Sequence, residues 1–80
     1  MTFREYQRAA ARTAKYPNRN DLPGLMYVGL GLTGEAGECA NIVKKWFRDD
    51  YLDREALVEE VGDVLWYCAM MANELDVTLE

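Results

Sequence analysis

The sequence has 80 residues, of which half are hydrophobic, and its 14 acidic and 9 basic side chains give a net charge of −5. This length suffices for one small domain. The acidic balance argues against a nucleic-acid-binding module, which normally carries a basic patch. No apolar run approaches the roughly 20 residues that cross a bilayer, and charged residues interrupt the N-terminus, where a signal peptide would be apolar. We therefore expect a cytoplasmic domain that binds neither nucleic acid nor a membrane.

The apolar content bears on the assembly of the chain, and the lack of histidine limits the side chains that could act in catalysis. A single core of this size rarely supplies more than about 3–5 kcal/mol of stability, so the apolar fraction predicts surface left over for a partner subunit in a homo-oligomer. Cys39 and Cys68 each lie in an apolar stretch, which predicts buried free thiols in a reducing compartment. Because histidine is absent, the commonest general base and zinc ligand is excluded, and carboxylates become the main candidates for chemistry.

The N-terminal segment predicts a first helix. Thr2 and Glu5 have the spacing of a capping box, in which each side chain accepts a hydrogen bond from the other residue's backbone. A helix is therefore expected from about Phe3 to about Lys15. Pro17 disfavours helical geometry in the residue before it, so a loop is expected over residues 16–20.

A second helix is predicted over residues 22–48, with Asp21 or the asparagine before it as the cap and Pro23 in the first turn. Five glycines fall in this stretch, and each costs about 1 kcal/mol relative to alanine in a helix interior. Such a density is useful where another backbone or a ligand comes close. A break within residues 29–34 is the alternative to one long helix.

A third helix is predicted over residues 54–75, capped by Asp53, because apolar residues recur on one face. Thr78 is placed to cap a further helix that the 80 residues do not contain. The strand pattern of alternating polar and apolar residues is missing from the helical segments. We therefore expect an all-α fold: one domain over residues 1–80, with three helices per chain and oligomerisation completing a four-helix-bundle-like active core.

Two pairs of acidic residues stand three positions apart, Glu35 with Glu38 and Glu60 with Asp63. Residues at this spacing share a helix face, with Cβ atoms about 5–6 Å apart, so the like charges of each pair repel. A divalent cation between the two helices would offset that repulsion, and four oxygen donors suit Mg²⁺ or Mn²⁺. The pattern therefore predicts a metal site formed by these four carboxylates.

Chance pairing on a solvated helix surface is the competing interpretation of these acids. Each pair, however, encloses a glycine and has apolar neighbours, which places the carboxylates at the border of the core and favours a metal site. Ferritin-like di-iron bundles also use inward carboxylates, but they need Glu-x-x-His motifs. The missing histidine argues against that class.

The chain resembles the MazG-like nucleotide pyrophosphohydrolases, of the all-α nucleoside triphosphate pyrophosphatase superfamily. The resemblance runs from about residue 30 to residue 80. It is carried by Gly34-Glu35-Ala36-Gly37-Glu38, Lys44-Lys45 and Glu59-Glu60-Val61-Gly62-Asp63-Val64-Leu65-Trp66-Tyr67. The family motif is EExxE followed by ExxD. Glu35 and Glu38 match its second and third acids, Glu60 and Asp63 match the ExxD, and Gly34 stands where the family has its first glutamate.

This resemblance implies an enzyme that hydrolyses a (d)NTP to the (d)NMP and pyrophosphate in nucleotide-pool housecleaning. It also implies a homodimer or a tetramer, with Mg²⁺ held by the four matched carboxylates. A metal of this kind neutralises phosphate charge and activates a water. Among the matched acids, Glu38 is the candidate for the catalytic base that takes the proton of that water.

Three further residues are candidates for contacts to the nucleotide. Lys45 lies two turns after Glu38 on nearly the same helix face, which suits a phosphate contact. Tyr67 lies one turn after Asp63, within hydrogen-bonding reach of phosphate or sugar. Asn73 is the third candidate for a substrate contact.

Several alternatives remain open. Trp46 and Trp66 either stack on a base or pack in the core or a dimer interface, and packing is the favoured interpretation. The chain is alternatively a non-catalytic helical oligomerisation module, in which the carboxylates pair with Lys44, Lys45 and Arg48. A nucleotide sensor that binds without turnover is the third hypothesis, and product analysis distinguishes it from an enzyme.

Overall fold

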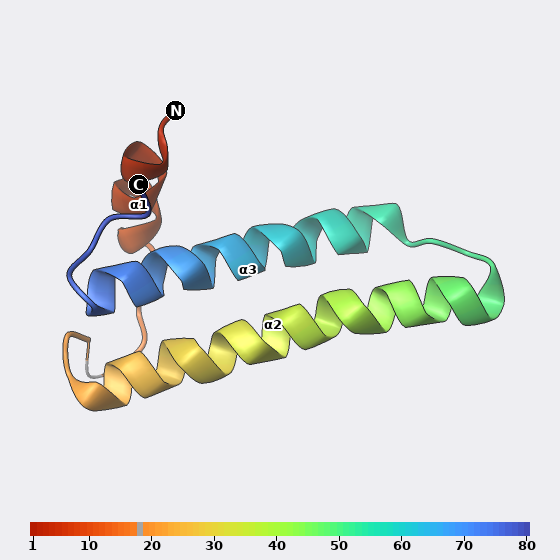
Figure 1. Ribbon diagram of the computed structural model, residues 1–80, viewed down its shortest axis with the longest axis horizontal. Helices are drawn as coiled ribbons and strands as arrows, with labels where there is room; N and C mark the ends of the chain where they lie inside the picture. Colours follow the sequence, from red (N-terminus) through yellow and green to blue (C-terminus); the bar gives the residue numbers. More distant parts are fainter. Residues whose placement is uncertain (18) are drawn as a thin grey trace.

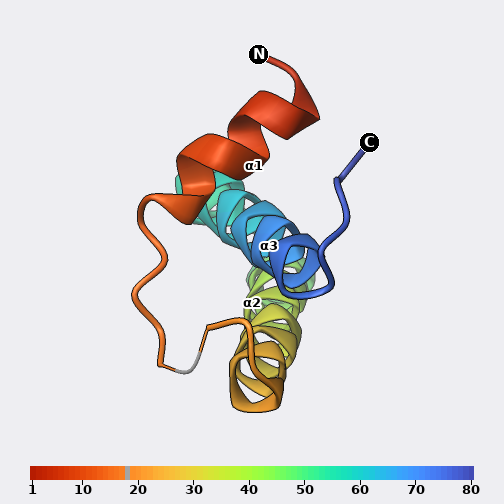
Figure 2. The same ribbon diagram turned by 90° about the vertical axis from the view of Figure 1, so that its left-hand side faces the viewer.

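A computed structural model describes residues 1–17 and 19–80. It contains three helices, α1 (Phe3–Ala11), α2 (Leu22–Asp49) and α3 (Arg54–Glu74), and these described residues include no strand. α2 and α3 form a long antiparallel hairpin (Figure 1). α1 crosses α3 on the side opposite α2, near the end of the chain (Figure 2). The all-α prediction with three helices is therefore confirmed. No helix among the described residues is both long and apolar enough to span a membrane.

α1 begins as predicted but ends early. The Thr2 hydroxyl accepts a hydrogen bond from the Glu5 backbone at 3.0 Å, and the Glu5 carboxylate accepts one from the Thr2 backbone at 2.9 Å. The helix ends at Ala11, so the predicted end at residue 15 is wrong. Beyond it the backbone makes successive i to i−3 hydrogen bonds, the pattern of a tighter turn. This turn buries Ala14 and Tyr16 in the core, and that burial overrides the local preference for helix. Residue 18 of the predicted loop lies outside the described residues.

α2 is one continuous helix, so the alternative with a break at the glycines is wrong. Asp21 occupies its N-cap position, although the Asp21 side chain makes no capping hydrogen bond. The helix is terminated at Asp50, whose φ of 54° is left-handed. The Asp53 carboxylate caps α3 as predicted, accepting a hydrogen bond from the Ala56 backbone at 3.1 Å.

The core lies at the end of the molecule where α1, the start of α2 and the end of α3 meet. Val28 and Met70 are the largest fully buried side chains, and Ala69 is fully buried beside them. Tyr16 stacks on Tyr27 at its edge, with ring centroids 5.3 Å apart and an interplanar angle of 11°. This end of the molecule therefore holds the hairpin in a fixed register.

A buried polar network ties α1 to the segment after α3. Gln7 is only 7% exposed. Its side-chain amide donates to the Asn73 side chain and to the Val77 carbonyl, the latter at 2.9 Å. Its side-chain oxygen accepts from the Leu79 backbone at 3.0 Å. The Gln7 side chain thus joins α1 both to the end of α3 and to the tail that follows it.

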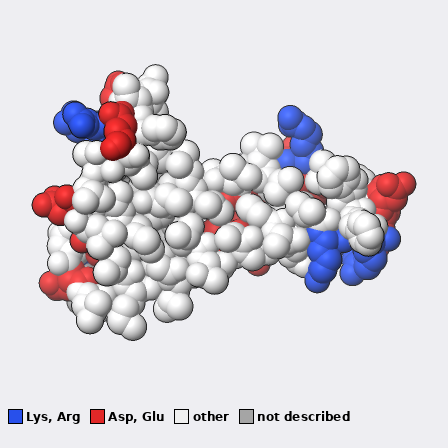
Figure 3. Space-filling model, in the orientation of Figure 1, with Lys and Arg blue, Asp and Glu red and all other residues white. Residues whose placement is uncertain are grey.

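The hairpin beyond the core exposes apolar side chains. Phe47 is 94% exposed. Further exposed apolar residues on the hairpin include Val43, Trp46, Tyr51, Val58 and Val61. Figure 3 shows basic side chains gathered toward the turn of the hairpin and acidic atoms recessed in its narrow middle. The uncovered apolar surface agrees with the expectation from composition, while the partner subunit stays a prediction.

Candidate metal centre

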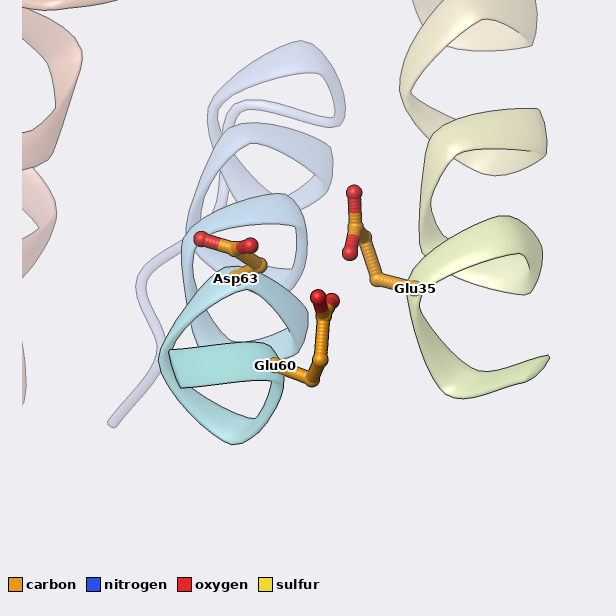
Figure 4. Close-up of side chains that lie close together, drawn as sticks. All are labelled: Glu35, Glu60 and Asp63. Carbon is orange, nitrogen blue, oxygen red and sulfur yellow. The ribbon is translucent and has the colours of Figure 1, made fainter. Parts of the chain in front are cut away.

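Three carboxylates from the two hairpin helices converge. Glu35 on α2 and Glu60 and Asp63 on α3 each offer an oxygen, and these oxygens all lie within 4.8 Å of one another. The spacing of Glu60 and Asp63 places both on one side of α3, and the packing of the hairpin brings Glu35 toward them from α2 (Figure 4). Glu35 and Glu60 are half-buried and Asp63 is exposed. The structure thus assembles three of the four carboxylates that the sequence predicts as ligands.

Glu38, the fourth, stands apart from this cluster. It follows Glu35 by nearly one turn, about 4.5 Å along the helix axis, and its side chain is exposed. The described acidic group comprises the other three residues only. The sequence spacing within α2 does not tell which of Glu35 and Glu38 faces α3, because that depends on how the two helices pack against each other. The roles of Glu38 as ligand and as catalytic base stay predictions.

The carboxylates are electrostatically strained in a way that fits a cation. The adjacent Glu35 carboxyl group raises the pKa of Glu60, and burial acts in the same direction. The Glu60 Oε2 atom is buried and has no hydrogen-bond partner among the described residues. Within those residues the ion pair that forms joins Arg48 to Asp49 at 2.7 Å, away from the cluster. A carboxylate oxygen buried without a donor is costly, and a hard divalent cation would supply the missing positive charge.

Tyr67 borders the cluster as the sequence predicts. It follows Asp63 by one turn, and its ring lies against Gly31 of α2. Burial raises the pKa of Tyr67, and the Tyr27 hydroxyl and then the negative charges of Glu35 and Asp63 raise it further. The phenol therefore stands close to the carboxylates as an uncharged hydroxyl. Its contact with a nucleotide stays a prediction.

Two residues near the cluster were missed by the sequence reasoning. Tyr6 on α1 is the first: burial raises the pKa of Tyr6, and the negative charge of Asp63 adds to the effect, which places its phenol within electrostatic range of the cluster. Gly31 is the other, since its backbone supports the Tyr67 ring. The density of glycines in α2 indicated in the sequence that another group lies close to this helix, and at Gly31 that group is the Tyr67 ring. Nothing in the sequence connected Tyr6 to the site, because only the crossing of α1 over α3 brings it there.

The other two predicted substrate contacts lie far from the cluster within one chain. Lys45 is exposed and follows Glu35 by ten residues, about 15 Å along α2. Asn73 follows Asp63 by the same interval on α3, and its side-chain oxygen accepts the hydrogen bond from Gln7. The structure does not bring either residue to the three carboxylates. Both stay predictions as contacts to the nucleotide.

Asn73 instead lines a cavity of about 670 Å³ where α1 meets the tail of the chain. Arg4, Arg8 and Arg19 line the same cavity. The cavity has an aliphatic wall at Val77, the residue whose carbonyl binds Gln7. The Asn73 side chain therefore has a structural partner on one side and an open space on the other.

The two tryptophans and the two thiols also have different surroundings. The Trp66 indole packs against the core and donates a hydrogen bond to the Thr13 hydroxyl at 2.9 Å, which supports the packing interpretation for this residue. Trp46 is exposed on the hairpin. Cys39 and Cys68 are free, as expected, but they are half-buried rather than fully buried.

A model of the MazG nucleotide pyrophosphohydrolase domain matches residues 27–80, a segment that holds all four predicted carboxylate ligands. The Gene 37 protein of Mycobacterium phage L5 is 51% identical over 82 residues, which cover 92% of this chain and 72% of that protein. No solved structure matches.

Proposed function

Because the chain belongs to the MazG nucleotide pyrophosphohydrolase family, we propose that it hydrolyses nucleoside triphosphates to monophosphate and pyrophosphate with Mg²⁺, or with Mn²⁺ in its place. One observation carries the metal dependence: Glu35, Glu60 and Asp63 converge within the matched segment, with oxygens no more than 4.8 Å apart. Family membership supports the reaction class. The proposed role in the cell is housecleaning of the nucleotide pool.

The residues of this chain take separate parts in the proposed reaction. Glu35, Glu60 and Asp63 would hold the cation, and the Glu60 oxygen without a hydrogen-bond partner among the described residues would gain most from it. When bound, Mg²⁺ would neutralise phosphate charge and lower the pKa of a water. Glu38, exposed and one turn after Glu35, would accept a proton from the attacking water as the general base. Tyr67 offers its neutral hydroxyl to the substrate beside the metal.

A purely structural module is less well supported. That alternative needs the carboxylates to be neutralised by Lys44, Lys45 and Arg48. Arg48 pairs instead with its neighbour Asp49, and within the described part of the chain no ion pair reaches the cluster. Carboxylates held close together without a cation repel one another and would lower the stability of a purely structural bundle. In a protein that binds a divalent cation, the same arrangement provides the ligands.

We also propose that a second copy of the chain covers the apolar half of the hairpin, in a homodimer or a tetramer. The support is the exposed surface defined above, with Phe47 at 94% exposure and Trp46 beside it. Apolar patches of this kind usually mark an interface on a small protein. Lys45 lies on the same half of α2, so in such an assembly it can approach a site of the neighbouring copy.

Product analysis tests the proposed reaction. The purified chain is incubated with each canonical and modified (d)NTP and Mg²⁺, and pyrophosphate and monophosphate are measured together. We expect equal amounts of both products, and a loss of at least about 100-fold in E60Q and D63N, since outer-shell partners of a metal alone are worth 10–100-fold. E59Q is the matched control, because Glu59 is an exposed neighbour outside the cluster.

Three outcomes would contradict the proposal. Activity that survives both substitutions would show that these carboxylates do not form the metal site. Activity that survives chelation would show that the reaction does not need a metal. Nucleotide that binds tightly without any product would identify a sensor.

A further inference from the structure

We propose that Gly31 is a positioning residue, whose bare backbone seats the Tyr67 ring and thereby sets the place of the phenol hydroxyl beside the carboxylate cluster. A Cβ atom on Gly31 would lie within 2.8 Å of three carbon atoms of the Tyr67 ring. Real Cβ atoms essentially never approach another atom so closely. The ring and a side chain at position 31 therefore exclude each other.

Four other glycines of the hairpin do not have this constraint. A Cβ on Gly34, Gly37 or Gly62 would meet no atom within 4 Å, and one on Gly29 would meet the Met71 methyl at an ordinary 3.6 Å. Glycine in a helix interior costs about 0.5–1 kcal/mol relative to alanine. At Gly31 the sequence accepts this cost because the Tyr67 ring occupies the space that a side chain would need.

The Tyr67 ring is also held from a second side. The Trp66 ring meets it edge to face, with centroids 5.0 Å apart and an interplanar angle of 86°. Trp66 is in turn anchored by its hydrogen bond to Thr13. A side chain at Gly31 would therefore push the Tyr67 ring off its seat or separate α2 from α3. Either response displaces the hydroxyl from its present position.

This placement has a kinetic consequence that rests on the proposed function. The Tyr67 hydroxyl is uncharged, and a neutral hydrogen bond to the sugar or to a phosphate that does not react is made equally in the ground state and the transition state. Such uniform binding lowers KM and leaves kcat nearly unchanged. Gly31 therefore acts on nucleotide affinity through Tyr67, while the carboxylates act on turnover.

A double-mutant cycle tests the assignment with G31A, Y67A and the combined variant, in full-length protein with Mg²⁺. We expect G31A to raise KM about tenfold while kcat stays within about twofold, and to add nothing once Tyr67 is alanine, since the ring it displaces is gone. G29A is the matched control on the same helix, and its KM should equal that of the wild type. An equal KM increase from G31A in both backgrounds, or the same increase in G29A, would overturn the assignment.

A second readout does not depend on catalysis. With 3-fluorotyrosine incorporated, the fluorine resonance that Y67F removes should shift in G31A and stay in place in G29A. If the wild type shows no hydrolysis, the proposed function fails, and the affinity for a nucleotide triphosphate measured by calorimetry replaces KM in the cycle. A Tyr67 resonance that is unmoved by G31A would overturn the positioning role by itself.

Discussion

The carboxylates of Glu35 on α2 and Glu60 on α3 face each other across the helix hairpin (Figure 4), and the proximity of Glu35 raises the pKa of Glu60. Together with Asp63 they gather acidic oxygens within 4.8 Å, and the ion pair between Arg48 and Asp49 contributes nothing to their neutralisation. Like charges held this close favour protonation or a bound cation. The arrangement therefore reduces stability when no metal is present and gives the protein an affinity for one.

Removing one of these charges should stabilise the metal-free protein. We expect E60Q in the presence of a chelator to unfold at a higher temperature than the wild type, because the repulsion from Glu35 is relieved. Mg²⁺ should raise the unfolding temperature of the wild type by binding to the native state and should raise that of E60Q much less. Thermal unfolding followed by circular dichroism, with E59Q as the control, measures both effects. A lower unfolding temperature for E60Q in the chelator would be inconsistent with this prediction.

The buried hydrogen bonds of Gln7 should contribute to the stability of the fold. Q7A leaves the Asn73 oxygen, the Val77 carbonyl and the Leu79 N–H without their partner. We expect a loss of about 1–3 kcal/mol in the free energy of unfolding, which is the usual cost of leaving buried polar groups unpaired. Urea unfolding measures this change, and R8A on the exposed side of α1 is the control. A Q7A value within the error of the R8A value would show that the network is dispensable.

The capping box of α1 should give the protein a specific pH dependence. Hydrogen bonds from the Thr2 backbone and then from its hydroxyl lower the pKa of Glu5 below 4.5. A depressed folded-state pKa contributes stability above the unfolded-state value, and this stability is lost as the pH falls through the folded-state value. We therefore expect E5Q to unfold at a lower temperature than the wild type at neutral pH. The difference should shrink below pH 4.5, and thermal unfolding at a series of pH values measures it. A gap between E5Q and wild type that is independent of pH would refute the role of the ionised carboxylate.

The apolar hairpin surface should control assembly. We expect the wild type to sediment as a dimer or a tetramer, and F47E to shift toward the monomer without loss of helix, because Phe47 is almost fully exposed in the single chain. Sedimentation velocity and circular dichroism on the same samples measure the two properties. A wild type that sediments as a monomer across the accessible concentrations would contradict the proposed interface.

The helices and their caps were accessible from the sequence, because they depend on local chemistry. The capping box at Thr2 and Glu5 and the cap at Asp53 follow from neighbouring residues, whereas the glycines of α2 leave its continuity undecided in the sequence. The end of α1 did not follow, because burial of Ala14 and Tyr16 in the core decides it. Local patterns are insufficient where distant packing competes with them.

The candidate site could be predicted from the sequence only in part, because local spacing fixes the helix face of a residue but not the packing between helices. The i, i+3 spacing predicts Glu35, Glu38, Glu60 and Asp63, since residues three apart share a helix face, and the structure brings all but Glu38 together. The separate position of Glu38, and the approach of Tyr6 from α1, depend on how the helices pack against one another. Spacing along a single helix contains no information about that packing.

The Mg²⁺ dependence of pyrophosphate release, compared between wild type and E35Q, tests the central claim most directly. Glu35 is the carboxylate that α2 contributes to the cluster, so its loss leaves only the α3 side of the site. We predict that the wild type saturates with Mg²⁺, and that E35Q needs at least about tenfold more Mg²⁺ for half its own maximal rate. Identical Mg²⁺ dependence in the two proteins would show that the metal does not bind between these helices.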